Sequence, residues 1–293
     1  MSKRSLDLLL TAVAPAIWGT TYIVTTEFLP NFSPITVAML RALPAGLLLL
    51  LIVRQLPSGL WWGRVFLLGA LNFSVFLSLL FISAYRLPGG VAGTVASIQP
   101  LFVIFLAYLV LASPIRRLSV IAALVGIGGV ALLVLTPRAA LDPIGILAGL
   151  AAAGSMACGT VLIRKWPPPV SLVTFTAWQL TAGGLLLVPV CLVFEPAMPV
   201  PTVVNLLALA WLGLIGMALT YMLWLRGIAR LGSPVASSLL LLSPVTAVVL
   251  GWLFLGQSLA VLQIVGGVLV IGSIWLGQYA FRSAAAPSPP LKG

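Results

Sequence analysis

The stretch RLPGGVAGTVASIQPLFVIFLAYLVLASPIRRLSVIAALVGIGGV, residues 86–130, aligns without gaps on RLGSPVASSLLLLSPVTAVVLGWLFLGQSLAVLQIVGGVLVIGSI, residues 230–274. Eleven of the 45 aligned positions are identical, and they include Arg86 with Arg230, Pro100 with Pro244 and Gly128 with Gly272. Leucine-rich sequences also match by chance, so the shared arginine, proline and glycine are the informative identities. These matches predict an internal duplication, with one copy in residues 1–137 and the other in residues 138–282.

Hydrophobic residues make up 61% of the 293 residues and charged residues only 6%, against roughly 25% charged residues in an average soluble domain. A bilayer core of about 30 Å requires about 20 apolar residues per helix. Charges, prolines and turn residues divide the chain into ten apolar segments: 6–26, 34–53, 65–85, 90–111, 118–135, 143–163, 171–193, 203–225, 234–255 and 260–281. We therefore predict an all-α membrane protein of ten transmembrane helices, followed by a disordered Pro-rich tail over residues 283–293.

Lysine and arginine are distributed unevenly between the two ends of these helices. Only Arg86 and Arg138 lie on the side away from the N-terminus, while Arg41 falls inside a helix. The other twelve lie on the side of the N-terminus, mostly in pairs: Lys3, Arg4, Arg54, Arg64, Arg116, Arg117, Arg164, Lys165, Arg226, Arg230, Arg282 and Lys292. Basic residues near helix ends stay in the cytoplasm, so both termini are predicted inside an inner (cytoplasmic) membrane. Their dispersal also argues against nucleic acid as a partner.

Each copy of the duplication contains five helices, an odd number, so the second copy must enter the membrane upside down. Two inverted five-helix repeats are typical of secondary transporters, because two related halves can open alternately to each side of the bilayer. The alternative is a duplicated helical bundle with no transport role.

Several stretches resemble a known group of transporters. The stretches are WGTTY at 18–22, LRALPAG at 40–46, LTYMLWLRGIARLGSPVASSLLLLSPVTAVVLGWLFLGQ at 219–257 and GGVLVIG at 266–272. They resemble the EamA-type branch of the drug/metabolite transporter superfamily, and the resemblance covers all of the chain except its tail. Within that branch the sequence is most similar to the aromatic amino-acid exporters of the YddG type. The resemblance implies a ten-helix exporter in the membrane.

The sequence lacks the residues that enzymatic chemistry inside a membrane would need. It contains no histidine, and no acidic residue falls near the middle of a predicted helix. We therefore predict no enzymatic activity, no metal site and no cofactor. Proton-driven pumps usually titrate an Asp, Glu or His within the membrane, whereas Glu27 lies at the outer end of its segment. Facilitated export without proton coupling is the simpler expectation.

Proline interrupts the fourth and ninth predicted helices. Proline lacks an amide hydrogen, so Pro100 and Pro244 are predicted hinges that free the carbonyl groups of Ala96 and Leu240 for a substrate ammonium. Each is preceded by a polar residue, Gln99 and Ser243 respectively. The alternative is a kink whose backbone groups are satisfied by neighbouring helices.

Arg41 is the candidate for binding a substrate carboxylate, because a charge inside a membrane helix is costly and usually functional. Snorkelling of its side chain toward the interface is the alternative. Gln179 takes the equivalent place in the second copy.

Aromatic and small polar residues at helical spacing complete the predicted substrate site: Trp18, Tyr22, Asn72, Phe76, Trp178 and Thr220, together with Gln99 and Ser243. Any of these polar residues could instead hold helices together. Tryptophans at helix ends are expected in belts at the membrane interface: Trp61, Trp62, Trp166, Trp224 and Trp275.

Together, these features predict an alternating-access exporter of small zwitterionic metabolites, with aromatic or large apolar amino acids as the first candidates. One alternative is an exporter of another metabolite or of a drug on the same scaffold. The other is a membrane scaffold protein that transports nothing. The expected partners are a small-molecule substrate and the lipid bilayer, and the sequence leaves the oligomeric state open.

Overall fold

The computed structural model describes residues 3–87, 95–96, 98–134, 142–255 and 260–282, and every regular element in them is helical. Six helices are long and apolar enough to cross a membrane: Lys3–Phe28, Pro34–Val53, Trp61–Arg86, Pro143–Lys165, Leu172–Phe194 and Val203–Leu231. Four shorter apolar helices cover Gln99–Leu111, Arg117–Leu132, Leu242–Phe254 and Ile264–Gly277. The prediction of ten apolar helices in this order is therefore confirmed for the described part of the chain.

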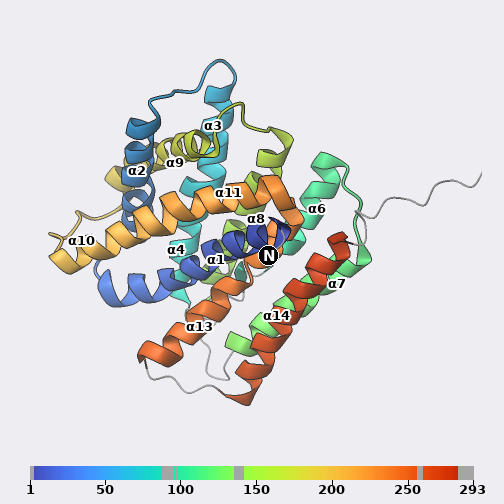
Figure 1. The fold of residues 1–293 in the computed structure, drawn as a ribbon. Coiled ribbons are helices and arrows are strands. Elements are labelled where there is room, and N and C mark those ends of the chain that lie inside the picture. The colour runs from blue at the N-terminus through green and yellow to red at the C-terminus, as the bar shows by residue number, and fades with distance from the viewer. Residues whose placement is uncertain (1–2, 88–94, 97, 135–141, 256–259, 283–293) are drawn as a thin grey trace, which may run out of the picture.

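The helices follow one another along the chain as Figure 1 labels them. The uninterrupted ones are α1 (Lys3–Phe28), α2 (Pro34–Val53), α6 (Gln99–Leu111), α7 (Arg117–Val134), α8 (Pro143–Lys165), α9 (Leu172–Phe194) and α14 (Val261–Arg282). Asp142 caps the start of α8 by accepting a hydrogen bond from the Gly145 amide at 2.7 Å. This bond holds the pKa of the Asp142 carboxyl below its ordinary value.

Two of the long helices change winding partway along. In the first copy, α3 (Trp61–Gly69) passes through the π-helical turn η1 (Ala70–Ser74) into α4 (Val75–Arg86). In the second copy, α10 (Val203–Ala210) passes through the π-helical η2 (Trp211–Leu219) into α11 (Thr220–Leu231). A π turn holds extra residues, so side chains beyond it are rotated relative to a continuous α-helix, and such turns are frequent at functional sites.

The ninth predicted helix is broken into α12 (Ser233–Leu239) and α13 (Leu242–Leu255). The amide of Ser243 donates to the Leu240 carbonyl at 2.9 Å. The prediction that Pro244 leaves this carbonyl free is therefore wrong, because the chain turns between the two helices and uses it. In the fourth predicted helix, Pro100 lies in the first turn of α6, where a missing amide hydrogen costs little.

Glycines allow two pairs of helices, one from each copy, to pack closely. A side chain on Gly46 of α2 would collide with the Thr181 amide of α9, and one on Gly184 would lie 2.6 Å from the Leu43 Cα. In the same way, Gly129 of α7 packs against α14. Small residues allow such close packing within a membrane, where the hydrophobic effect does not drive helices together. Figure 1 shows α7 and α14 side by side at one edge of the bundle, and α2 with α9 at another.

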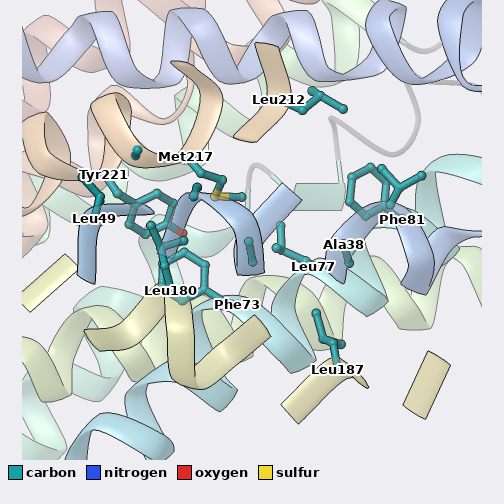
Figure 2. Close-up of a cluster of buried hydrophobic side chains, with 14 of the residues drawn as sticks. Ala38, Leu49, Phe73, Leu77, Phe81, Leu180, Leu187, Leu212, Met217 and Tyr221 are labelled. Atoms are coloured by element: carbon teal, nitrogen blue, oxygen red, sulfur yellow. The ribbon is translucent and has the colours of Figure 1, made fainter. Parts of the chain in front are cut away.

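The remaining long helices cross between the copies. Helix α1 packs against α11 and α13, while α8 packs against α4 and α6. The largest buried apolar cluster lies around α2, with side chains from η1, α4, α9 and η2 packed against it, and Figure 2 shows Phe73, Leu180, Met217 and Tyr221 within it. Met217 and Tyr221 also border a cavity, so the core and the cavity share a wall.

Candidate functional site

A cavity of about 120 Å³ lies between α1, α4, α11 and the break between α12 and α13. Most of its walls are aliphatic or aromatic, with hydroxyl and amide groups at a few places. Its lining consists of Trp18, Thr21, Tyr22, Thr25, Thr26, Arg41, Phe76, Leu77, Leu80, Phe81, Ala84, Tyr85, Ala96, Gln99, Met156, Met217, Tyr221, Leu240, Ser243 and Pro244. An apolar pocket with a few convergent polar groups is the usual form of a small-molecule site.

Seven of the residues predicted for the site or its hinges line this cavity: Trp18, Tyr22, Arg41, Phe76, Gln99, Ser243 and Pro244. They come from five different helical segments, the first being α1 and the last α13. The structure therefore brings together residues that lie more than 200 positions apart in sequence.

Arg41 is the only charged side chain in the described lining of the cavity. It is 2% exposed, and its Nη2 atom donates to the Gly216 carbonyl of η2 at 3.2 Å. Its Nε atom has no hydrogen-bond partner among the described residues. No carboxylate lines the cavity in the described part of the chain, so the guanidinium has no acidic neighbour there to neutralise it.

Hydrogen bonds to η2 and α11 hold the Trp18 indole in place. Its indole Nε1 donates to the Gly216 carbonyl at 3.0 Å and to the Thr220 hydroxyl at 2.9 Å. Thr220 is fully buried and donates in turn to the same carbonyl at 2.8 Å. Helical spacing predicts Thr220 in the lining of the site, but it lies behind Trp18 and orients that ring.

Tyr221 and Met217 line the cavity, although the sequence analysis does not identify either of them. The Tyr221 hydroxyl donates to the Asn72 carbonyl at 3.3 Å, and its ring lies 5.3 Å from Trp18 and 4.5 Å from Phe73. The two rings of Trp18 and Tyr221 thus form a continuous aromatic wall. The only sequence signal for Tyr221 is its position next to Thr220. The winding of η2 determines which of these two side chains faces the cavity, and the sequence does not show that winding.

Asn72 and Gln179 do not line the cavity. The Asn72 side-chain amide donates to the Gln179 carbonyl oxygen at 2.9 Å, and both residues are 1% exposed. Helical spacing predicts that Asn72 shares a face with Phe76, but Asn72 lies in the π turn η1, whose different winding separates the two. The hydrogen bond between them links η1 to α9. These two residues therefore hold helices together, which is the alternative role of polar residues within a membrane.

Two tryptophan assignments need correction, and the predicted hinge Pro100 lies away from the cavity. Trp178 lies in a separate buried cluster, and its Nε1 donates to the Gln55 carbonyl at 2.6 Å. Trp224, expected in an interfacial belt, is 1% exposed and packs edge-on against Trp18 at 5.3 Å. Pro100 lines a different and smaller space beside α7 and α14. Neighbouring helices cover both tryptophans, and helical spacing alone does not reveal which side chains are covered in this way.

The two ends of α1 differ in their packing. From Trp18 to Thr26, α1 lines the cavity. Toward its N-terminus, Asp7 forms ion pairs with Arg226 and with Arg230 of α11, at 2.5 and 3.4 Å. One turn along, α1 and α11 are so close that a side chain on Gly227 would collide with Thr11. The bundle is therefore tightly closed at the N-terminal end of α1.

A corresponding ion pair lies at the opposite end, beside the cavity. Arg86 at the end of α4 and Asp142 at the start of α8 approach to 3.4 Å, with side chains 45% and 35% exposed. Arg86 aligns with Arg230 in the duplication. Each arginine thus bonds an acidic residue at the start of the other copy's first helix, and the acid at the cavity end is the more exposed of the two.

Comparison with known proteins identifies the family. The EamA-like transporter family matches residues 6–135 and again residues 143–277. Protein PecM of Dickeya dadantii is 46% identical over 268 residues, covering 90% of each chain. A probable amino-acid metabolite efflux pump of Salmonella typhimurium is 24% identical, covering 96% of this chain and 97% of that one. The inner membrane transporter YedA of Escherichia coli is 26% identical, over 94% and 92%.

A solved crystal structure, 20% identical in sequence, shares the fold with a TM-score of 0.78, covering 96% of this chain and 99% of the other. These matches confirm the resemblance to the drug/metabolite transporters that the sequence motifs indicate. Both family matches together span nearly the whole chain, so this multi-pass membrane protein belongs to the EamA-like transporter family.

Proposed function

We propose that the chain exports small zwitterionic metabolites across the inner membrane, with aromatic or large apolar amino acids as its first substrates. The observation that carries this proposal is the buried guanidinium of Arg41, the one charged group in the described lining of a cavity whose walls are mostly aliphatic and aromatic. A carboxylate would neutralise it through a charge-assisted hydrogen bond. The efflux-pump name of one relative supports the same class of cargo.

The rest of the substrate finds complementary groups in the same cavity. An apolar or aromatic side chain would lie against Trp18, Tyr22 and Phe76, since offset and edge-on ring pairs contribute about 0.5–1.5 kcal/mol each. An ammonium requires acceptors, and the side-chain oxygens of Gln99 and Ser243 take this role in place of the Leu240 carbonyl, which is already bonded. Pro244 and Pro100 remain the proposed hinges of the broken helices.

Transport requires the cavity to open at one end of the bundle at a time. With both termini in the cytoplasm and the second copy inverted, the ion pair of Asp7 with Arg226 and Arg230 would close the cytoplasmic end. The pair of Arg86 with Asp142, which is more exposed in this structure, would become buried and close the outer end in the opposite state. Reciprocal packing of the two copies, α1 on α11 and α8 on α4, supports this exchange.

Two rival functions have observations against them. A cationic drug would meet the guanidinium of Arg41 with no carboxylate in the described lining to offset it. A scaffold protein that transports nothing would have no need of a cavity with a charge inside it, because a buried unpaired cation is costly. The amino-acid proposal accounts for both features.

The proposal is tested by counterflow in liposomes containing the purified protein. Liposomes preloaded with unlabelled phenylalanine should accumulate labelled phenylalanine, and accumulation should persist when an uncoupler removes the pH difference and the voltage. Counterflow of other compounds but of no amino acid would contradict the substrate class. Absence of counterflow for every compound, with the protein still folded, would favour the scaffold alternative.

A further inference from the structure

A second pocket, of about 200 Å³, lies at the end of the bundle away from the substrate cavity. It forms where α6 ends, α7 begins, and α8 and α11 end. Its lining consists of Ile104, Ala107, Leu111, Ser113, Pro114, Arg116, Ser119, Arg164, Leu231 and Gly232. Two arginines from different copies of the duplication, Arg116 and Arg164, therefore face one space.

No acidic residue lines this pocket in the described part of the chain. Ser119 also lines the pocket; it is 5% exposed, and its hydroxyl has no hydrogen-bond partner among the described residues. Two cations and a spare hydroxyl donor around one space form a site for an anion with several oxygens, such as a phosphate.

Exposed apolar side chains lie beside the pocket. On α6, the side chains of Phe105, Tyr108 and Leu109 are each at least half exposed. On the other side of Arg164 a further pocket of about 260 Å³ is lined mainly by apolar residues, including Leu172 and Phe175. An anion bound between the arginines would therefore have room for hydrocarbon chains alongside.

We propose that Arg116 and Arg164 bind the phosphate of an anionic phospholipid whose acyl chains lie along α6. Basic pockets between transmembrane helices on the cytoplasmic side are suited to lipid headgroups of this charge. The site is built from both copies, since α6 and α7 belong to the first copy and α8 and α11 belong to the second. A bound lipid would thus connect the two halves independently of any transported substrate.

The test is native mass spectrometry of the full-length protein in detergent, titrated with phosphatidylglycerol, phosphatidylcholine or inorganic phosphate. The variants Arg116→Gln and Arg164→Gln are compared with Arg117→Gln and Lys165→Gln. The control residues are the immediate neighbours, carry the same charge and do not line the pocket. Unfolding temperatures in lipid-free detergent verify that all four variants remain folded.

We expect phosphatidylglycerol to be retained by the unmodified protein and phosphatidylcholine to bind at least about tenfold more weakly. Loss of either pocket arginine should weaken phosphatidylglycerol binding about fivefold, while each control should change it less than about twofold. Equal binding of the two lipids, or equal losses in pocket and control variants, would overturn the proposal. Inorganic phosphate binding as tightly as phosphatidylglycerol would assign the site to a soluble anion and refute the lipid.

Discussion

Replacing Arg41 by Gln should remove the ability of the cavity to distinguish a carboxylate from an amide. Arg41 is the one charged group in the described lining, and it is 2% exposed, so little water screens its contact with a ligand. A hydrogen bond to a charged group contributes about 1.5–3 kcal/mol. The affinity for phenylalanine should therefore fall about ten- to hundredfold.

The same substitution should leave the fold intact. The Gly216 carbonyl, which accepts from Arg41, also accepts from Trp18 at 3.0 Å and Thr220 at 2.8 Å. This carbonyl therefore keeps hydrogen-bond donors after Arg41 is replaced. Removing a costly buried charge also offsets part of the stability lost with the Arg41 contact. An unfolding temperature within a few degrees of the unmodified protein is the expected result.

The assay is a binding titration of the purified protein with phenylalanine and with phenylalaninamide, which keeps the ring and the amine but lacks the carboxylate. The unmodified protein should prefer phenylalanine, and Arg41→Gln should bind the two ligands with similar affinity. Arg54→Gln is the matched control, because Arg54 lies exposed at the end of the same helix. If Arg41→Gln weakens both ligands equally while remaining folded, Arg41 supports the structure and does not recognise a carboxylate.

Three further predictions concern the bundle around the site. In a variant with both natural cysteines replaced, a cysteine at Val200 should react with an impermeant reagent from outside the cell and one at Ser58 should not; the reverse pattern would contradict the proposed orientation. Gly46→Ala should lower the unfolding temperature by forcing α2 away from Thr181, at a cost of about 1–3 kcal/mol, whereas Gly128→Ala, with open space around it, should not. Asp7→Arg should destabilise the closed end, and adding Arg226→Asp should restore part of the lost stability; a double-mutant cycle with a coupling near zero would show that the ion pair does not hold this end shut.

The number and order of the helices could be predicted because a bilayer imposes a length and an apolar composition on each of them. The substrate cavity could be anticipated in part for a related reason. Polar and charged residues are rare in such helices, so Arg41, Gln99 and Ser243 stand out in the sequence, and all three line the cavity. Trp18 and Tyr22 also line it, one turn apart on α1 as helical spacing requires.

The remaining assignments depended on winding and on contacts between distant segments. The π turns η1 and η2 rotate the residues C-terminal to them, so the spacing of Asn72, Phe76 and Thr220 does not show which side chains face the cavity. The side-chain amides of Asn72 and Gln179 form a hydrogen bond across 107 positions of sequence. Nothing in either local sequence distinguishes such a pair from two substrate contacts, and only the tertiary structure separates them.

Blocking the cavity beside Arg41 is the most direct test of whether this cavity is the route of transport. Ala84 lines the cavity from α4, whereas Ala151 of α8 is exposed on the outer surface of the bundle. Phenylalanine counterflow should be measured in liposomes containing Ala84→Trp or Ala151→Trp at equal amounts of folded protein. We predict loss of counterflow for Ala84→Trp and near-normal counterflow for Ala151→Trp. Undiminished counterflow with Ala84→Trp would show that substrate passes elsewhere.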